Sequence, residues 1–158
     1  MKLYACALIA ALCLLVATPA RAQSSPTTAQ TVNALVSDGT LAANVLMTVL
    51  QDFKAPDKSC AFKQSALQVG LAIGISEVLK AVVRRQRPDL SDYRDFPSEH
   101  TAIAFASSGW SVYYGYSLAI GTGVERRTSD RHDWTGVIAG AAVGEGSKWL
   151  GARLWKCA

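Results

Sequence analysis

Apolar residues recur at three- and four-residue spacing along most of the chain, which is the periodicity of helices that bury one face. This pattern predicts helices over residues 31–52, 62–84 and 134–154. Gly39 weakens the first of them, so that stretch fits either one helix or two short ones. No segment alternates with the two-residue period of a strand. The sequence therefore predicts an all-α bundle of about four to six helices, in a single domain over residues 23–158.

Residues 101–124 form a stretch without any charged side chain. Ser98 stands before this stretch as a good helix N-cap, directly after Pro97. The length would suffice to span a membrane, although several serines and glycines make the stretch only moderately apolar. A buried helical hairpin with a turn near Gly109 or Gly115 fits the same residues.

The first residues have the features of an export signal. Lys2 supplies a positive start, residues 3–16 form an apolar run of signal-peptide length, and residues 20–22 (Ala-Arg-Ala) match a small-x-small cleavage site. Cleavage of residues 1–22 would leave a polar start, 23–30, that resembles a flexible leader. An uncleaved N-terminal anchor is the alternative. The sequence thus predicts an exported, periplasmic protein, either soluble or in contact with the membrane.

Composition narrows the possible partners. Half of the residues are hydrophobic and only 18% are charged, which argues against a disordered chain. The formal charge is +4, and loss of Lys2 and Arg21 with the signal peptide would reduce it by two, to +2. Such a mild excess, without a dense basic stripe, gives no support for nucleic-acid binding.

Cysteine usage points to an oxidising compartment. Cleavage would remove Cys6 and Cys13 and leave Cys60 and Cys157 as an even pair. A disulfide between them would close a loop of roughly a hundred residues and contribute about 4–5 kcal/mol if chain entropy alone is considered. Two separate thiols are the alternative.

The two histidines lie in or beside two charged segments, 84–97 and 125–133, that are predicted to be loops. The cationic side chains near them are Lys80, Arg87 and Arg126. A phosphate monoester carries close to two negative charges, so two guanidinium forks and one ammonium suit its oxygens. The helix start at Ser98 adds backbone N–H groups and the positive end of the helix dipole. One histidine could attack phosphorus while the other protonates the leaving oxygen, and these cations make a metal or other cofactor unnecessary.

Three motifs contain these residues in order: Lys80-x6-Arg87-Pro88, Pro97-Ser98-x-His100 and Arg126-x5-His132. Together they resemble the three-part signature of the type-2 phosphatidic-acid phosphatase superfamily. This superfamily includes bacterial acid phosphatases, undecaprenyl-diphosphate phosphatases and vanadium haloperoxidases. The resemblance spans about residues 80–140 and extends to the flanking phrases FPSEHTAIAFAS and DRHDWTGVIAGAAVG. Each motif alone would also fit a solvated basic loop or a surface histidine with ion partners. The catalytic interpretation therefore rests on the three motifs together.

The resemblance implies a helical phosphatase, and the predicted signal peptide implies that it is exported. Its substrates would be phosphate monoesters, or lipid phosphates and diphosphates such as a phospholipid or a polyprenyl phosphate. His132 would be the nucleophile that forms a phosphohistidine, and His100 would be the general acid. The residues expected to hold the phosphoryl oxygens are Lys80, Arg87, Ser98 and Arg126. No metal and no cofactor is expected.

Gly136 departs from the family pattern. The family usually places an aspartate four residues after the nucleophilic histidine, where residues i and i+4 share a helix face and the carboxylate can orient the ring. Asp130 and Asp133 are the remaining candidates for this role, although Asp133 would point about 100° away around a helix. Loss of the orienting carboxylate favours an alternative function, a catalytically impaired relative that binds an anion or a phospholipid without turnover.

Glu99 and the spacing of the motifs are two further departures. Glu99 stands where the family usually has glycine, and we expect a solvated side chain stabilised by the helix dipole. His100 and Arg126 are closer in sequence than the two helices that normally separate these motifs allow. One continuous helix would hold its ends roughly 35 Å apart, so an assembled site requires the hairpin. Vanadate-dependent oxidation is disfavoured because the chain is too small for the usual haloperoxidase scaffold.

Overall fold

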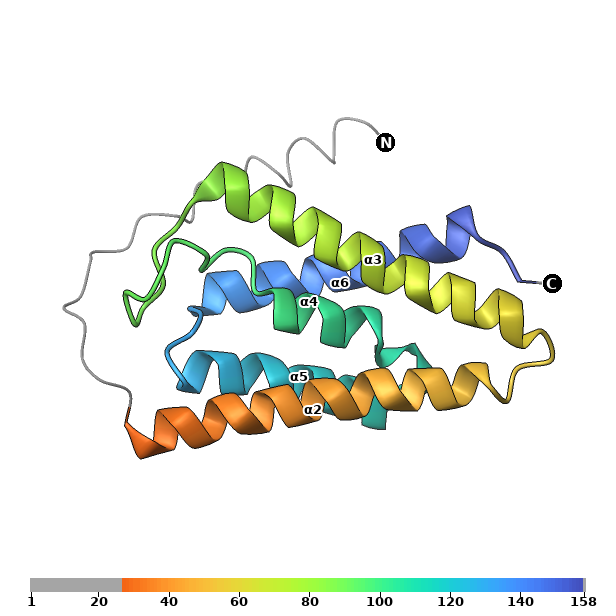
Figure 1. Ribbon diagram of the computed structural model, residues 1–158, viewed down its shortest axis with the longest axis horizontal. Coiled ribbons are helices and arrows are strands. Elements are labelled where there is room, and N and C mark those ends of the chain that lie inside the picture. The colour runs from red at the N-terminus through yellow and green to blue at the C-terminus, as the bar shows by residue number, and fades with distance from the viewer. Residues whose placement is uncertain (1–26, 158) are drawn as a thin grey trace.

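The computed structural model describes residues 27–157, so the predicted signal peptide over residues 1–22 lies outside the described part of the chain. Within residues 27–157 the chain forms five α-helices, one short 3₁₀ helix and no strand, packed as a bundle (Figure 1). The elements are α2 (Thr28–Asp52), α3 (Lys58–Val83), α4 (Glu99–Ala106), η1 (Ser108–Trp110), α5 (Tyr114–Thr128) and α6 (Trp134–Leu154). The predicted all-α bundle is confirmed.

α2 is one continuous helix that begins earlier than the apolar pattern predicts. Thr27 and Gln30 form a capping box, in which the Gln30 N–H donates to Thr27 Oγ1 (3.2 Å) and the Thr27 N–H donates to Gln30 Oε1 (2.8 Å). These bonds satisfy N–H groups that have no partner inside the helix. The flexible leader expected over 23–30 is therefore wrong for its last three residues, and Gly39 does not break the helix.

The uncharged stretch 101–124 folds as a hairpin, which is the arrangement that an assembled site requires. Residues 107–113 separate α4 from α5, and they include η1 and Gly109. Gly115 follows the turn at a point where any Cβ atom would overlap the carbonyl group of Ser108. A glycine is needed here because two backbones approach each other so closely.

A buried asparagine on α2 holds this turn in place. Asn44 Nδ2 donates to the carbonyl oxygens of Ala104 (2.9 Å) and Gly115 (3.1 Å), and Asn44 Oδ1 accepts from the Trp110 indole (2.6 Å). Asn44 is fully buried, so these bonds satisfy polar groups that water does not reach. α2 therefore fixes the end of α4 and the start of α5.

α4 lies at the centre of the bundle and contacts α2, α3, α5 and α6 (Figure 1). Its buried residues are small: Thr101, Ala102, Ala104 and Ala106. Gly140 and Gly144 of α6 face them, and a Cβ atom on Gly144 would lie 2.6 Å from the Cβ atom of Phe105. The two backbones therefore approach closely, and the Ser98 N–H donates to the carbonyl of Gly136 (2.9 Å). This packing brings the starts of α4 and α6 together.

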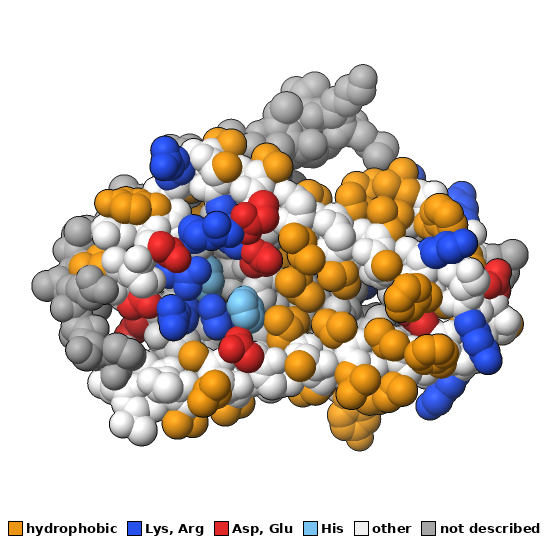
Figure 2. Space-filling view, viewed as in Figure 1, with side chains coloured by type: hydrophobic (Ala, Val, Ile, Leu, Met, Phe, Trp, Pro, Cys, Tyr) orange, Lys and Arg blue, Asp and Glu red, His pale blue; other side chains and the backbone are white. Residues whose placement is uncertain are grey.

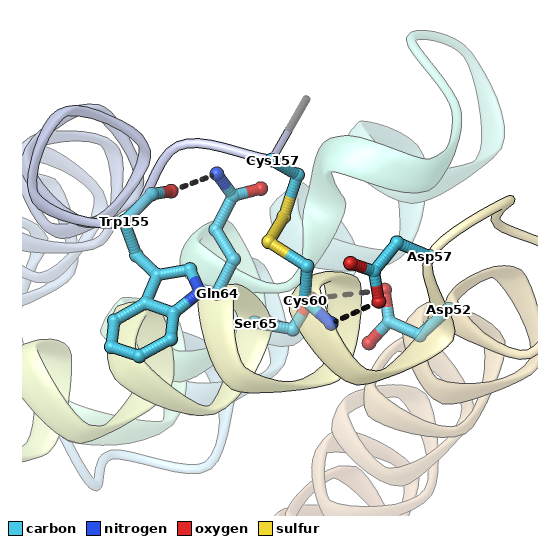
Figure 3. The surroundings of a disulfide bond; sticks show 7 residues. All are labelled: Asp52, Asp57, Cys60, Gln64, Ser65, Trp155 and Cys157. Carbon is cyan, nitrogen blue, oxygen red and sulfur yellow. Dashed lines mark hydrogen bonds between the residues drawn. A yellow bond between two sulfur atoms is a disulfide. The ribbon is translucent and has the colours of Figure 1, made fainter.

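A disulfide joins Cys60, in the first turn of α3, to Cys157 in the C-terminal tail (Figure 3). Their Cα atoms are 5.6 Å apart, although 97 positions separate them in sequence. Beside the bridge, Gln64 donates to the Trp155 carbonyl (2.5 Å) and Asp57 accepts from the Cys60 N–H (2.9 Å). The bridge therefore ties down the C-terminus at the end of α3 that lies far from the starts of α4 and α6 (Figure 1).

α2 and α3 are both long and apolar enough to cross a membrane, judged by length and composition. Only 11% and 17% of their most apolar windows are buried, whereas the core helix of a soluble protein would be mostly buried. Their exposed apolar side chains include Leu35, Leu46, Phe53, Val78 and Val82. The stretch 101–124, which the sequence offers as a spanning candidate, is instead broken by the hairpin.

Replacement of Asn44 by alanine is expected to lower the free energy of unfolding by about 2–3 kcal/mol, because three buried polar groups lose their partner. The measurement is denaturant-induced unfolding in detergent. Asn33→Ala is the matched control, since it removes the same amide from the same helix away from the turn. Its expected effect is below about 1 kcal/mol. Equal losses in the two variants would contradict the importance of the Asn44 contacts.

Candidate active site

The motif residues meet at the end of the bundle where α3 and α5 end and α4 and α6 begin (Figure 1). Figure 2 shows Lys and Arg side chains gathered around both histidines on the face between α2 and α3, with Asp and Glu side chains beside them. The predicted site residues at this end are Lys80, Arg87, Ser98, His100, Arg126 and His132. The contacts described below join His100, Arg126 and His132, and the charge of Arg87 lowers the pKa of His132.

Arg126 lies in the last turn of α5, so the loop predicted over 125–133 is shorter than expected. Asp130 adopts a left-handed backbone conformation (φ 54°), which turns the chain back on the helix end. The N–H groups of Arg131 and His132 both donate to the carbonyl of Arg126, each at 3.1 Å. These bonds satisfy a free carbonyl at the end of the helix and fix His132 next to Arg126.

His132 is almost completely buried, and the contacts of its imidazole are with Asp95. Nδ1 lies 2.5 Å from the backbone carbonyl oxygen of Asp95 and 3.5 Å from Asp95 Oδ1. A carbonyl oxygen only accepts, so the proton is on Nδ1 and Nε2 keeps its lone pair. Burial lowers the pKa of His132, and the contacts with Asp95 oppose this shift only in part. The ring is therefore neutral at pH 7, with Nε2 in the nucleophilic form.

Asp130 and Asp133, the carboxylates predicted to orient His132, are both engaged elsewhere. Asp130 accepts from Arg127 at 2.9 Å. Asp133 is the N-cap of α6 and also pairs with Arg85. Neither carboxylate contacts the imidazole, because a helix cap and two ion pairs hold them away from it.

Gly136 does not leave room for the aspartate that the family pattern would place there. A Cβ atom on Gly136 would lie 2.6 Å from the carbonyl oxygen of Asp95. This is the same oxygen that accepts from Nδ1 of His132. The carboxylate next to the ring is that of Asp95, which lies in the loop between α3 and α4.

His100, in the first turn of α4, faces a carboxylate from α2. Its Nε2 lies 3.0 Å from Asp38 Oδ1, and Arg126 Nη1 lies 3.5 Å from the same oxygen. Burial lowers the pKa of His100 to about 4, the charge of Arg126 adds to this shift, and Asp38 opposes it. His100 is therefore neutral at pH 7, and Asp38 connects it to a guanidinium.

Arg126 is buried and still charged. Burial lowers its pKa to about 10, so it remains protonated at pH 7, and Asp38 opposes the shift. Its Nε is buried and has no hydrogen-bond partner among residues 27–157. A buried donor without an acceptor is unfavourable, so this nitrogen favours an anion that binds beside the histidines.

Lys80 is buried and pairs with two carboxylates, Glu77 at 2.9 Å and Glu99. The solvated Glu99 expected from the sequence is therefore wrong. Its side chain turns to Lys80 because a buried ammonium needs a counter-charge. Arg87 pairs with Asp92 at 2.7 Å. An incoming anion must therefore compete with a carboxylate for Lys80 and for Arg87.

Ser98 occupies the N-cap position of α4 and is fully buried. Its hydroxyl makes no cap bond, and instead its Oγ is 2.9 Å from Thr101 Oγ1, which donates to it. The Ser98 hydroxyl proton is thus available to an acceptor in the site.

Asp38 and Asp95 were not among the residues predicted from the motifs. The sequence does hold one signal for Asp38, which is the only charged residue of α2 before Asp52. A lone carboxylate on an apolar helix often marks a functional site. Asp95 gives no such signal, because it lies among other charged residues in the segment 84–97 and only the fold brings it to His132.

Cationic side chains and histidines, which can bind an anion, characterise this site. Within residues 27–157, no group of three or more His, Cys, Asp or Glu side chains is placed to hold a metal ion. Arg87 and Arg126 are close enough to His132 for their charges to lower its pKa, and both histidines are neutral at pH 7. The fold and the site together define a class of protein, an all-α bundle whose one end gathers cationic side chains and two histidines that suit a phosphate group.

Comparison with known proteins agrees with this class. No family model matches the chain. A lipid A 1-phosphatase from Porphyromonas gingivalis is 37% identical over 90 residues, a match that covers 50% of this chain and only 20% of that relative. The crystal structure of Aquifex aeolicus LpxE has a similar fold, with a TM-score of 0.62 over 78% of this chain and 85% of that chain, at 18% identity. The sequence similarity and the fold confirm the relationship to the type-2 phosphatidic-acid phosphatase superfamily that the motifs predict.

Binding of inorganic phosphate is expected to raise the pKa of His100 from about 4, because a nearby dianion favours the protonated ring. The measurement is an NMR titration of the His100 ring protons with and without phosphate. Asp38→Asn is expected to lower the pKa of His100 in both titrations, since it removes the carboxylate that favours the charged ring. An unchanged pKa at saturating phosphate would contradict an anion site beside His100.

Proposed function

We propose that this chain is a phosphatase that hydrolyses lipid phosphates, or other phosphate esters, through a phosphohistidine on His132. The state of His132 is the observation that carries the proposal. It is a buried, neutral imidazole whose Nδ1 proton is held by a carbonyl and whose backbone is bonded to the cationic Arg126. An imidazole with a free Nε2 lone pair is a nucleophile, and a guanidinium next to it attracts a phosphate to that nitrogen.

In the first half of the reaction, Nε2 of His132 attacks phosphorus and the bond from phosphorus to the ester oxygen breaks. The leaving oxygen takes a proton from His100, and the alcohol departs. His100 must be protonated at this step, and the charge of the bound phosphate favours that form. Asp38, at 3.0 Å, holds the ring while it carries the proton.

In the second half, water attacks the phosphorus of the phosphohistidine and the bond from nitrogen to phosphorus breaks. The neutral His100 accepts the proton of the water, which restores its acid form for the next cycle. Inorganic phosphate leaves, and His132 returns to the neutral state. The reaction consumes one water and needs no cofactor.

The cationic side chains stabilise the charge that develops on the phosphoryl oxygens. Arg126 offers its buried Nε, and the Ser98 hydroxyl adds a neutral donor. Lys80 and Arg87 contribute after they exchange a carboxylate for a phosphoryl oxygen. The exchange at Arg87 is inexpensive because its partner Asp92 is 41% exposed and water can take over that carboxylate.

An apolar groove favours a lipid as the source of the phosphate. The groove has a volume of about 490 Å³ and runs along α2 from His100 and Asp38. Its apolar lining consists of Leu41, Ala42, Val45, Leu46 and Val49. Figure 2 shows the apolar surface continuing away from the histidines along this face. An acyl chain would be buried there while its phosphate reaches the histidines, and the similarity to a lipid A 1-phosphatase supports the same class of substrate.

The proposal includes a location at a membrane outside the cytoplasm. The outward apolar faces of α2 and α3 favour membrane contact. The disulfide between Cys60 and Cys157 favours an oxidising compartment, as does the signal peptide predicted over residues 1–22. The periplasm meets both conditions.

One observation favours a second function, a relative that binds phosphate or a phospholipid without turnover. Lys80 is held by Glu77 and Glu99 together, so two carboxylates oppose an incoming anion at this position. A protein of this kind would bind inorganic phosphate weakly and release none from an ester.

The purified protein in detergent is expected to release inorganic phosphate from a lipid phosphomonoester. His132→Ala is expected to lower kcat/KM by about 10³-fold or more, because it removes the nucleophile. An acid-labile, base-stable phosphoprotein should form in the wild type on rapid mixing and be absent from this variant. Equal background release by both proteins would exclude the enzyme and favour the binding protein.

Arg126→Ala is expected to lower kcat/KM about 100-fold, because a buried donor to the phosphoryl group is lost. Arg127→Ala is the matched control, since it removes the adjacent arginine, which pairs with Asp130 at the surface. Its activity should stay within about twofold of the wild type. Similar losses in both variants would show that the general charge of this end, and not a specific donor, matters.

Leu41→Ser and Val45→Ser are expected to raise the KM for a lipid phosphate by about three- to tenfold, because each removes apolar contact with the acyl chain. The KM for the soluble ester p-nitrophenyl phosphate should not change. Leu35→Ser is the control, because Leu35 is an exposed leucine of the same helix outside the groove. Parallel changes with both substrates would contradict a groove for the acyl chain.

A further inference from the structure

A buried ion pair lies next to His132, on the Nδ1 side of its ring. Asp95 is fully buried, and its Oδ2 lies 3.0 Å from Nε of the buried Arg85. The backbones of the two residues are also bonded, since the Asp95 N–H donates to the Arg85 carbonyl at 3.0 Å. Asp95 Oδ1 accepts from the Asp133 N–H at 3.1 Å. A carboxylate that is removed from water in this way needs the counter-charge that the neighbouring guanidinium supplies.

This carboxylate lies on the Nδ1 side of the His132 ring, opposite to Nε2. Asp95 contacts the ring twice, through its carbonyl oxygen at 2.5 Å and through Oδ1 at 3.5 Å. The carbonyl fixes the tautomer, and the negative charge stabilises the positive charge that the ring gains when Nε2 bonds to phosphorus. Neutralisation of Arg85 does not by itself require this carboxylate, because Asp133 is a second anionic partner for Arg85.

The backbone carbonyl of Asp95 also lies where a side chain at position 136 would begin. Built on Gly136, a Cβ atom would lie 3.6 Å from Asp95 Oδ1 and 2.6 Å from the Asp95 carbonyl oxygen. An aspartate at 136 would therefore displace Asp95 from His132. Gly136 is thus a requirement of this arrangement, because the loop before α4 packs directly on the first turn of α6.

We infer that Asp95, held by Arg85, is the positioning residue of His132 and replaces the aspartate that related enzymes carry four positions after the histidine. The inference rests on the proposed function only in that His132 is taken as the nucleophile. It assigns no contact with the substrate to Asp95.

Asp95→Asn and Asp133→Asn form a matched pair that tests this assignment. Each removes one anionic partner of Arg85, and asparagine can still accept a backbone N–H in both places. Only Asp95 touches the ring of His132. Asp95→Asn is expected to lower kcat about 100-fold with little change in KM, and Asp133→Asn to stay within about threefold of the wild type.

The double variant Arg85→Gln/Asp95→Asn guards against a failure to fold, because it removes both buried charges together and leaves no unpaired guanidinium. It should show the helical circular dichroism of the wild type and the same low kcat as Asp95→Asn. A folded double variant with wild-type kcat would overturn the assignment. So would equal kcat values for Asp95→Asn and Asp133→Asn.

NMR of the His132 ring separates this inference from the proposed function. A strong hydrogen bond near a negative charge shifts the resonance of the Nδ1 proton downfield. This shift can be measured whether or not the protein hydrolyses a substrate. Asp95→Asn should move the resonance upfield, while Asp133→Asn should leave it in place. If the wild type hydrolyses no ester and the resonance still responds to Asp95→Asn alone, the proposed function fails and the positioning assignment stands. If Asp95→Asn does not change the chemical shift of the Nδ1 proton, the assignment is wrong even when the enzyme is active.

Discussion

The close approach of the loop before α4 to the first turn of α6 is the constraint on which the site depends. Three bonds hold it: Nδ1 of His132 to the Asp95 carbonyl, the Asp133 N–H to Asp95 Oδ1, and the Ser98 N–H to the Gly136 carbonyl. The absence of a side chain at Gly136 permits all three, because a Cβ atom there would overlap the Asp95 carbonyl. Through this approach His132 and the start of α4, with His100, come to the same end of the bundle.

Burial determines the electrostatic state of this pocket. It lowers the pKa of both histidines, so two neutral rings lie among cations at pH 7. It also makes unpaired charge costly, which explains why Lys80 and Arg87 are paired with carboxylates. Arg126 also lies 3.5 Å from Asp38, yet its Nε is buried and has no acceptor among the described residues. A phosphate group would supply an acceptor to this nitrogen. Its negative charge would also favour the protonated form of His100, which is the form that the proposed general acid requires.

α2 serves the site with several of its faces. Asn44 points into the bundle and fixes the turn that lets α4 and α5 run as a hairpin. Asp38, Leu41 and Val45 share another face, since residues three and four apart lie side by side on a helix, and they connect the contact with His100 to the apolar groove. The remaining apolar surface of α2, with that of α3, faces outward. Under the proposed function, a lipid phosphate would pass from the membrane to the histidines along this helix.

The sequence by itself determined the class of fold and the residues on which the proposed chemistry rests. Apolar periodicity gave the helices, and the three motifs gave the cations and both histidines, because such features depend on residues within one or two helical turns. The need for a hairpin in the uncharged stretch also followed from the sequence, since one long helix would have separated the motifs. Only the tertiary structure decided which carboxylates serve the histidines. Asp95 lies 37 positions before His132 and Asp38 lies on another helix, and helix packing sets such pairings while local sequence does not.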